Sequence, residues 1–280
     1  IFSVSGSGES VNIMAIEGHQ RELRMKKEKL KRKKAEMREE SPYSWSRLFW
    51  LFLLASFLGA LLEIVFCFLT TGQVMSRSSL VIGQFSLVWG LGVVLFTLTL
   101  RWMRNRTDRC LFLAGTLMGG VFEYLCSLLT EILFGGVFWD YSRFKLNLGG
   151  RVNLLFCVGW GAIAILWARV LYPRLSVRVD RIAERAGRLV TAALALFMVG
   201  NMLLSTIALD RYMERQRGHI QEDTEMDAVM DRCFPDSLME ERYPSLKIRL
   251  EDGSLTYPGR AGNTTLKSVV SQRETENRMR

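Results

Sequence analysis

The chain has 280 residues, of which 49% are hydrophobic, and a formal net charge of +9 at pH 7. This hydrophobic content would suit one or two globular domains, but the apolar residues are gathered into long blocks. The five cysteines form no CxxC pair and the two histidines lie outside the apolar blocks, which excludes a zinc motif and a Ser-His-Asp triad among those blocks. No GxxxxGK[ST] loop is present, so this chain lacks that route to ATP hydrolysis.

Residues 1–45 are predicted to form a disordered, basic segment in the cytoplasm. Clustered lysine and arginine can bind nucleic acid, but here they alternate with glutamates and have no aromatic residues between them. This pattern favours a solvated segment near anionic lipid, without a nucleic-acid partner. The chain opens on Ile1, and Met14 is a candidate for the natural start.

Five apolar blocks follow, each at least 21 residues long and nearly free of charge: 48–70, 80–100, 110–134, 152–172 and 189–209. A helix needs about 20 such residues to cross a hydrocarbon core of about 30 Å, with its backbone hydrogen bonds made inside the segment. We therefore predict an all-α fold, a polytopic membrane helix bundle of five transmembrane helices over residues 46–210.

Basic residues in the connections predict the orientation. The second and fourth connections are rich in arginine, whereas the first carries Arg77 and the third carries three basic residues. Short flanks rich in lysine and arginine stay in the cytoplasm, so the N-terminus is expected inside and the C-terminus outside. Arg211, Arg215 and Arg217 follow the fifth block, on the side expected to be poor in basic residues.

Two carboxylates lie inside the apolar blocks, Glu63 in the first and Glu123 in the third. An ionised carboxylate at that depth costs about 2.5 to 3.5 kcal/mol on lenient scales, so it faces a partner or a cavity. One interpretation is a protonated glutamate in a single interhelical hydrogen bond. The other, which we favour because two carboxylates lie at similar depth, is a polar cavity or ion path open towards Arg77 on the outer side.

The third connection, residues 135–151, is the most distinctive segment. Trp139 and Tyr141 suit the boundary between membrane and water. Asp140 can accept hydrogen bonds from Arg151 or Arg77, and Arg151 can instead reach a carboxylate beneath the loop. We expect a structured cap over the bundle. Expected substrate-binding residues are Glu63, Arg77, Glu123, Asp140, Asn147 and Arg151; no catalytic residue, metal ligand or cofactor is predicted.

The polar tail, residues 211–280, is expected to be partly disordered because of its mixed charge. One hairpin is predicted there, with residues 246–250 and 255–257 as strands.

Several motifs resemble a known family, the type IV group of ABC transporter permeases, CmpB-like membrane proteins found mainly in Firmicutes. The resemblance covers about residues 57–175. It depends on these residues: Gly59 with Glu63; Arg77, Gly83 and Gly90; Glu123, Tyr124, Ser127 and Glu131; Trp139, Asp140, Tyr141 and Ser142; Asn147, Gly150 and Arg151; Trp160 and Gly161. Two departures are Gln84 to Leu87 in place of a Pro-x-Cys-Pro turn, and Gly149 in place of an asparagine.

The resemblance implies a permease subunit in the bacterial cytoplasmic membrane that moves an unknown solute. Its expected surroundings are the lipid bilayer and either a separate ATPase subunit or further copies of itself, because five helices alone rarely enclose a path with alternating access. The alternative is a membrane-embedded enzyme or lipid-binding protein that acts on an envelope component. Without a recognised catalytic motif, we do not expect an enzyme.

Overall fold

The computed structural model describes residues 21–29, 44–103, 105–218, 224–249 and 253–258. It divides into two compact units, Ile1–Trp45 and Ser46–Arg280. In the first unit, residues 21–29 form a helix, and most of the expected disordered segment lies outside the described residues.

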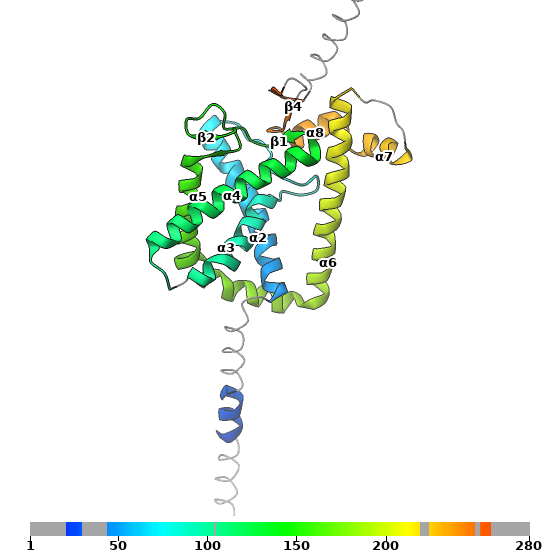
Figure 1. The fold of residues 1–280 in the computed structure, drawn as a ribbon. Coiled ribbons are helices and arrows are strands. Elements are labelled where there is room, and N and C mark those ends of the chain that lie inside the picture. The colour runs from blue at the N-terminus through cyan, green and yellow to red at the C-terminus, as the bar shows by residue number, and fades with distance from the viewer. Residues whose placement is uncertain (1–20, 30–43, 104, 219–223, 250–252, 259–280) are drawn as a thin grey trace, which may run out of the picture. The chain divides into compact units, whose positions relative to one another are not determined.

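The second unit is mostly helical (Figure 1). Its elements in chain order are α2 (Trp45–Thr71), α3 (Leu87–Leu100), η1 (Arg101–Met103), α4 (Asp108–Phe134), β1 (Gly136–Val137), β2 (Asn147–Leu148), β3 (Val152–Asn153), α5 (Leu154–Leu166), η2 (Trp167–Leu171), α6 (Tyr172–Gln216), α7 (Glu225–Cys233), α8 (Asp236–Arg242), β4 (Lys247–Arg249) and β5 (Leu255–Thr256).

Three helical segments of the described chain are long and apolar enough to cross a membrane: Trp45–Thr71, Asp108–Phe134 and Leu154–Gln216. The last has 63 residues and contains the fifth apolar block and all of the fourth but its first two residues, while α3 is shorter. The helical membrane fold is therefore confirmed, whereas the count of five spans is not.

The second apolar block is helical only from Leu87 onwards. The loop before it is held in a non-helical conformation, because the buried Ser78 hydroxyl accepts hydrogen bonds from the backbone N–H groups of Leu80 and Phe85. Asn201 of α6 bonds both the N–H and the carbonyl of Ile82. Irregular backbone beside an apolar helix is tolerated where such partners satisfy it, so this loop can lie against the middle of α6.

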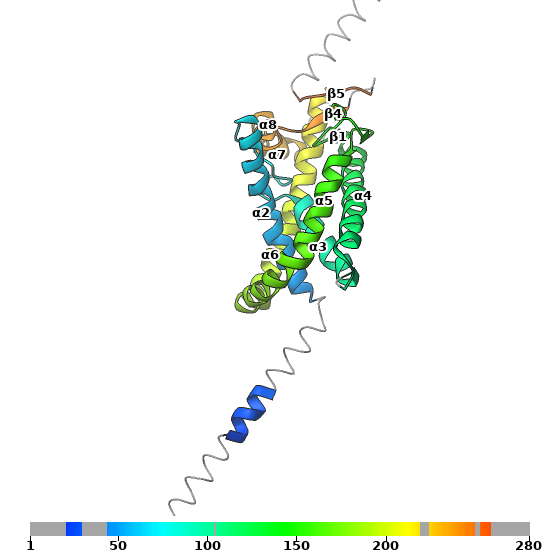
Figure 2. The ribbon, with the colours of Figure 1, turned by 90° about the vertical axis from the view of Figure 1, so that its left-hand side faces the viewer.

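One glycine divides α6 into two parts. Gly187 has φ 71° and ψ 177°, a left-handed conformation that favours glycine. Residues 172–186 run crosswise at one end of the bundle, and the part after Gly187 rises alongside the other helices (Figures 1 and 2). The fourth and fifth apolar blocks are thus joined by helix rather than by a loop.

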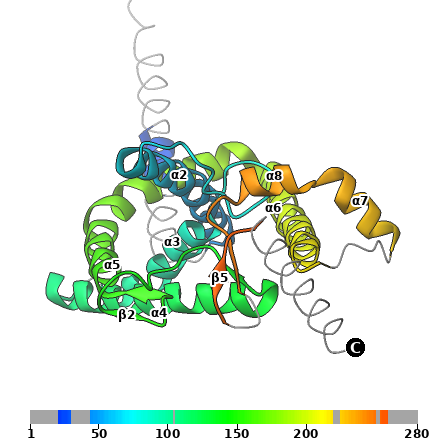
Figure 3. The same cartoon turned by 90° about the horizontal axis from the view of Figure 1, so that it is seen from above.

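Buried side chains form two clusters at opposite ends of the unit. The first joins Trp50, Leu100, Leu111, Trp167 and Val179, so it ties the start of α2 to the crosswise part of α6. The second joins the end of α6 to α8 and β4 through Tyr212, Met239, Tyr243, Leu246 and Ile248. The C-terminal segment therefore completes the core at the end that is viewed in Figure 3.

Two small antiparallel sheets shape that same end. β4 pairs with β1 and with β5, with Val137 opposite Lys247 and Ile248 opposite Thr256. β2 pairs with β3. The predicted hairpin is confirmed by the pairing of β4 with β5, whereas helices α7 and α8 were not predicted from the sequence.

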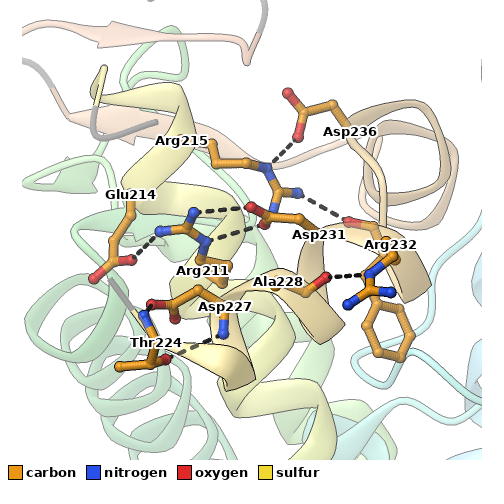
Figure 4. A network of polar contacts seen from close by, with 10 residues as sticks. Arg211, Glu214, Arg215, Thr224, Asp227, Ala228, Asp231, Arg232 and Asp236 are labelled. Carbon is orange, nitrogen blue, oxygen red and sulfur yellow. Dashed lines mark hydrogen bonds and ion pairs between the residues drawn. The ribbon is translucent and has the colours of Figure 1, made fainter. Parts of the chain in front are cut away.

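Two of the three arginines after the fifth block, Arg211 and Arg215, are paired with acidic residues of α7 and α8 (Figure 4), while Arg217 donates to the Phe134 carbonyl. Arg211 donates to both carboxylate oxygens of Asp231 at 3.0 and 2.8 Å, and Arg215 bonds Asp231 and Asp236. The hydrogen bond from Arg211 is the main cause that holds the pKa of Asp231 below its usual value. Two of the basic residues on the expected outer side are therefore neutralised locally.

We expect Gly119→Ala to destabilise the protein, because a Cβ atom there would collide with Cβ and Cγ of Trp160. Overpacking of this kind costs about 1 to 3 kcal/mol, and thermal unfolding in detergent measures it. The matched control is Gly159→Ala, also helical, where a Cβ meets nothing within 4 Å. The control should be neutral or gain up to about 1 kcal/mol from helix propensity. Equal unfolding temperatures for the two variants would contradict this packing.

Candidate functional site

Glu63 of α2 is held by two donors. The Arg77 Nε donates to its Oε2 at 2.9 Å, and the Trp89 indole N–H donates to its Oε1 at 2.6 Å. Arg77 comes from the loop after α2, and its Nη1 also donates to the Ser245 hydroxyl at 2.5 Å. Glu63 and Arg77, which were predicted to lie near each other, thus form an ion pair. Ser245 of the C-terminal segment contacts this pair directly.

Glu123 of α4 is buried, with 6% of its surface exposed. The Tyr141 hydroxyl donates to its Oε1 at 2.7 Å, and the Trp160 indole N–H donates to its Oε2 at 3.3 Å. Burial, and then the charge of Glu123, raise the pKa of Tyr141, so the phenol keeps its proton and acts as the donor. Tyr141 also stacks on Phe156, with 4.7 Å between ring centroids.

The two tryptophans link the two carboxylates. The ring centroids of Trp89 and Trp160 lie 6.0 Å apart, and each indole donates its N–H to a different glutamate. We call this arrangement the indole bridge; its members are Glu63, Trp89, Trp160 and Glu123. The carboxylates therefore belong to one connected polar group within the apolar helices.

Asp140 does not take the partner expected from the sequence. Its Oδ1 accepts from the backbone N–H and hydroxyl of Ser142 at 2.9 and 2.6 Å, and Lys247 Nζ lies 2.9 Å from its Oδ2. Burial alone would raise the pKa of Asp140, but these bonds outweigh it and lower the pKa to about 2. Lys247 replaces the expected arginine because strand β4 places it opposite Val137, near Asp140.

Arg151 takes the second of its two expected partners, a carboxylate beneath the loop. Its Nη2 lies 2.7 Å from Oε2 of Glu131 on α4. Arg249 donates to the other oxygen of Glu131 at 2.6 Å, so one carboxylate joins the third connection to the C-terminal strand. The Trp139 indole donates to the Arg151 carbonyl at 2.9 Å, which fixes the same corner.

Asn147 organises the backbone of the cap. Its side-chain amide donates to the Phe144 carbonyl at 2.7 Å, and its oxygen accepts from the Gly150 N–H at 2.8 Å. Both ends of the side chain are therefore used within the loop. Asp140, Asn147 and Arg151 lie together in an ordered cap, while Glu63, Arg77 and Glu123 belong to the indole bridge and its ion pair.

Sequence reasoning did not assign Trp89, Trp160, Ser245, Lys247 or Arg249 to the site. The three tail residues recur at every second position, whereas Leu246 and Ile248 between them are fully buried. This alternation is the signal of a strand with one polar and one buried face. Tryptophan within an apolar block carries an N–H that needs an acceptor, which is the signal for the indole bridge.

The described residues contain no group of three or more histidine, cysteine, aspartate or glutamate side chains that could hold a metal ion. The chemistry available is instead that of carboxylate acceptors, indole rings and a paired guanidinium.

Comparison with known proteins identifies one family. The family model described as Putative ABC-transporter type IV matches residues 50–206, which include the indole bridge and the cap. No curated protein and no solved structure matches the chain.

Tyr141→Phe should destabilise the protein by about 1 to 3 kcal/mol, because the buried Glu123 loses a donor while the ring and its stacking remain. Unfolding in detergent measures the change. Tyr124→Phe is the control, since Arg151 contacts only the ring of Tyr124 and no described residue bonds its hydroxyl. The role of Tyr141 as a donor would be refuted by a variant as stable as this control.

Proposed function

Since the chain belongs to the type IV ABC-transporter family, we propose that it is the permease subunit of a transporter in the bacterial cytoplasmic membrane. In this proposal a solute moves past Glu63 and Glu123, and a separate ATPase subunit supplies the energy. The indole bridge is the observation that carries the proposal. Two acidic side chains in apolar helices are costly, and a solute path is a functional reason to keep them.

We further propose five crossings with the N-terminus in the cytoplasm. The 14-residue α3 spans only roughly 21 Å, and the loop before it, buried against α6, extends its depth. Gly187 separates the fourth crossing, α5 with η2, from the fifth, the later part of α6. The arginine-rich connections support this orientation.

The chemistry of the site favours a solute with a cationic or hydrogen-bond-donating group. Glu63 is paired with Arg77, but Glu123 accepts from two neutral donors, so the ionised site has one carboxylate more than it has cations. Indole faces also attract cations. A cationic group of the solute would replace the Tyr141 hydroxyl at Glu123 or the guanidinium at Glu63.

Asp140, Asn147 and Arg151 have a supporting role in this proposal. Their partners lie within the cap, on α4 and on the C-terminal strand, so they hold the cap in place at the end of the path. The alternative, an enzyme or lipid-binding protein, would use Arg77 and Arg151 to bind a lipid phosphate. Both arginines are instead paired with glutamates, which favours the transporter.

Replacing either bridge carboxylate, as Glu63→Gln or Glu123→Gln, should abolish complementation of a strain that lacks the chain. A ten-fold loss in transport rate corresponds to about 1.4 kcal/mol of activation free energy. Removing the negative charge that binds the cation should reduce transport by more than this. Glu241→Gln, which changes an exposed carboxylate on α8, is the matched control and should complement. All variants should reach the same level in the membrane and should co-purify the same amount of ATPase. Full complementation by both site variants, or absence of an ATPase partner, would refute the proposed function.

The orientation can be measured with cysteines. Cys110 and Cys233 are both exposed, at the start of α4 and the end of α7, at opposite ends of the bundle. In single-cysteine variants, a membrane-impermeant maleimide should label Cys233 in intact cells and Cys110 only after lysis. Labelling of Cys233 only after lysis would exclude an odd number of crossings with the N-terminus inside.

A further inference from the structure

Four arginines form a row along the crosswise part of α6, residues 172–186. Arg174, Arg178, Arg181 and Arg185 follow one another at spacings of four, three and four, which places them on one face of a helix. All four are exposed. Among the described residues, no carboxylate forms an ion pair with any of them. We call this set the arginine row.

The opposite face of the same segment is packed against the bundle. Val179 is buried and, with Leu175 and Ala183 beside it, joins the cluster that contains Trp50 of α2 and Leu100 of α3. Arg47 at the start of α2 donates to both oxygens of Asp180 at 2.7 Å, which fixes the segment further. The arginine row is therefore held rigidly at the ends of the apolar helices, facing away from them.

Apolar side chains are exposed on both sides of the row. Val177 and Ile182 flank it, and Leu189, 84% exposed, follows at the start of the rising part of α6. Trp102, 82% exposed, lies on η1, whose Met103 packs into the same cluster. Exposed tryptophan at the ends of apolar helices is typical of the boundary between membrane and water. This arrangement is the one expected of a segment at the depth of the lipid headgroups.

We propose that the arginine row is a binding surface for the headgroups of anionic phospholipids. A helix with basic and apolar residues side by side matches the headgroup layer, where phosphates meet the first acyl carbons. An acidic soluble partner would match the arginines but would leave the exposed valine, isoleucine and leucine without lipid contact. This inference needs only that the chain spans a membrane, and it is independent of the transport proposal.

The test uses the full chain, reconstituted in nanodiscs with equal amounts of phosphatidylglycerol and phosphatidylcholine of the same acyl chains. Native mass spectrometry then counts the lipids that the released protein retains. The wild type should retain phosphatidylglycerol preferentially. Each arginine removed should weaken this retention by about five-fold, and raising salt from about 0.1 M to about 1 M should weaken it too.

Two triple variants remove three positive charges each. Arg178→Gln/Arg181→Gln/Arg185→Gln should lose the preference, whereas Arg143→Gln/Lys145→Gln/Arg232→Gln, exposed positions at the opposite end, should keep it. Replacing the same three arginines of the row by lysine should also keep it, because the charge is retained. If the glutamine triple fails to fold, the single variant Arg181→Gln still has to show the five-fold loss.

Three outcomes would overturn the proposal. The wild type could retain the two lipids equally, or both triple variants could lose the preference to the same extent. The row variant could also keep its lipid preference while a co-purifying ATPase is lost, which would assign the surface to a protein partner. Membrane insertion and unfolding temperature are measured in parallel, so that a misfolded variant is recognised. A failure of the transport proposal alone would leave this lipid test unaffected.

Discussion

A carboxylate inside an apolar helix must find its donors within the protein, because hydrocarbon supplies none. Glu63 and Glu123 impose this condition on the elements around them. Arg77 and Tyr141 have to turn inward from two loops, and Trp89 and Trp160 have to project from two helices. Gly119 has no side chain because Trp160 needs that space to reach Glu123.

The same condition governs the loops at the site end of the bundle. Lys247 and Arg249 of the C-terminal strand pair with Asp140 and Glu131, while Ser245 accepts from Arg77. Two connections that are distant in the sequence, together with the end of α4, are thus held by one short C-terminal segment, residues 245–249. Its polar residues bind carboxylates and the guanidinium, and its apolar residues enter the core. The cap, the indole bridge and the C-terminal segment are therefore parts of one connected structure.

Much of this could be predicted from the sequence, because blocks of more than 20 apolar residues and charges within them are local signals. They indicated the helical membrane fold, the two carboxylates Glu63 and Glu123 within its apolar helices, an ordered third connection and the β4–β5 hairpin. The partners could not be predicted in the same way. The indoles of Trp89 and Trp160 were not assigned as donors to the glutamates. A strand was predicted over residues 246–250, but its pairing with β1, which brings Lys247 and Arg249 to Asp140 and Glu131, was not. The helical join through Gly187 also escaped prediction, since glycine after a row of arginines is equally typical of a loop.

The position of strand β4 in the chain has a consequence for the order of assembly. Glu63 and Arg77 are 14 residues apart, so their ion pair can form as soon as the first loop is made. Glu131 waits for Arg249, which is 118 residues later and, at about 5 to 20 residues per second, is synthesised roughly 6 to 24 seconds afterwards. During that interval Arg151 is the nearer cation available to Glu131. The helices of the bundle are thus synthesised before β4, which then adds Arg249 to the Glu131–Arg151 pair and holds this end of the bundle together.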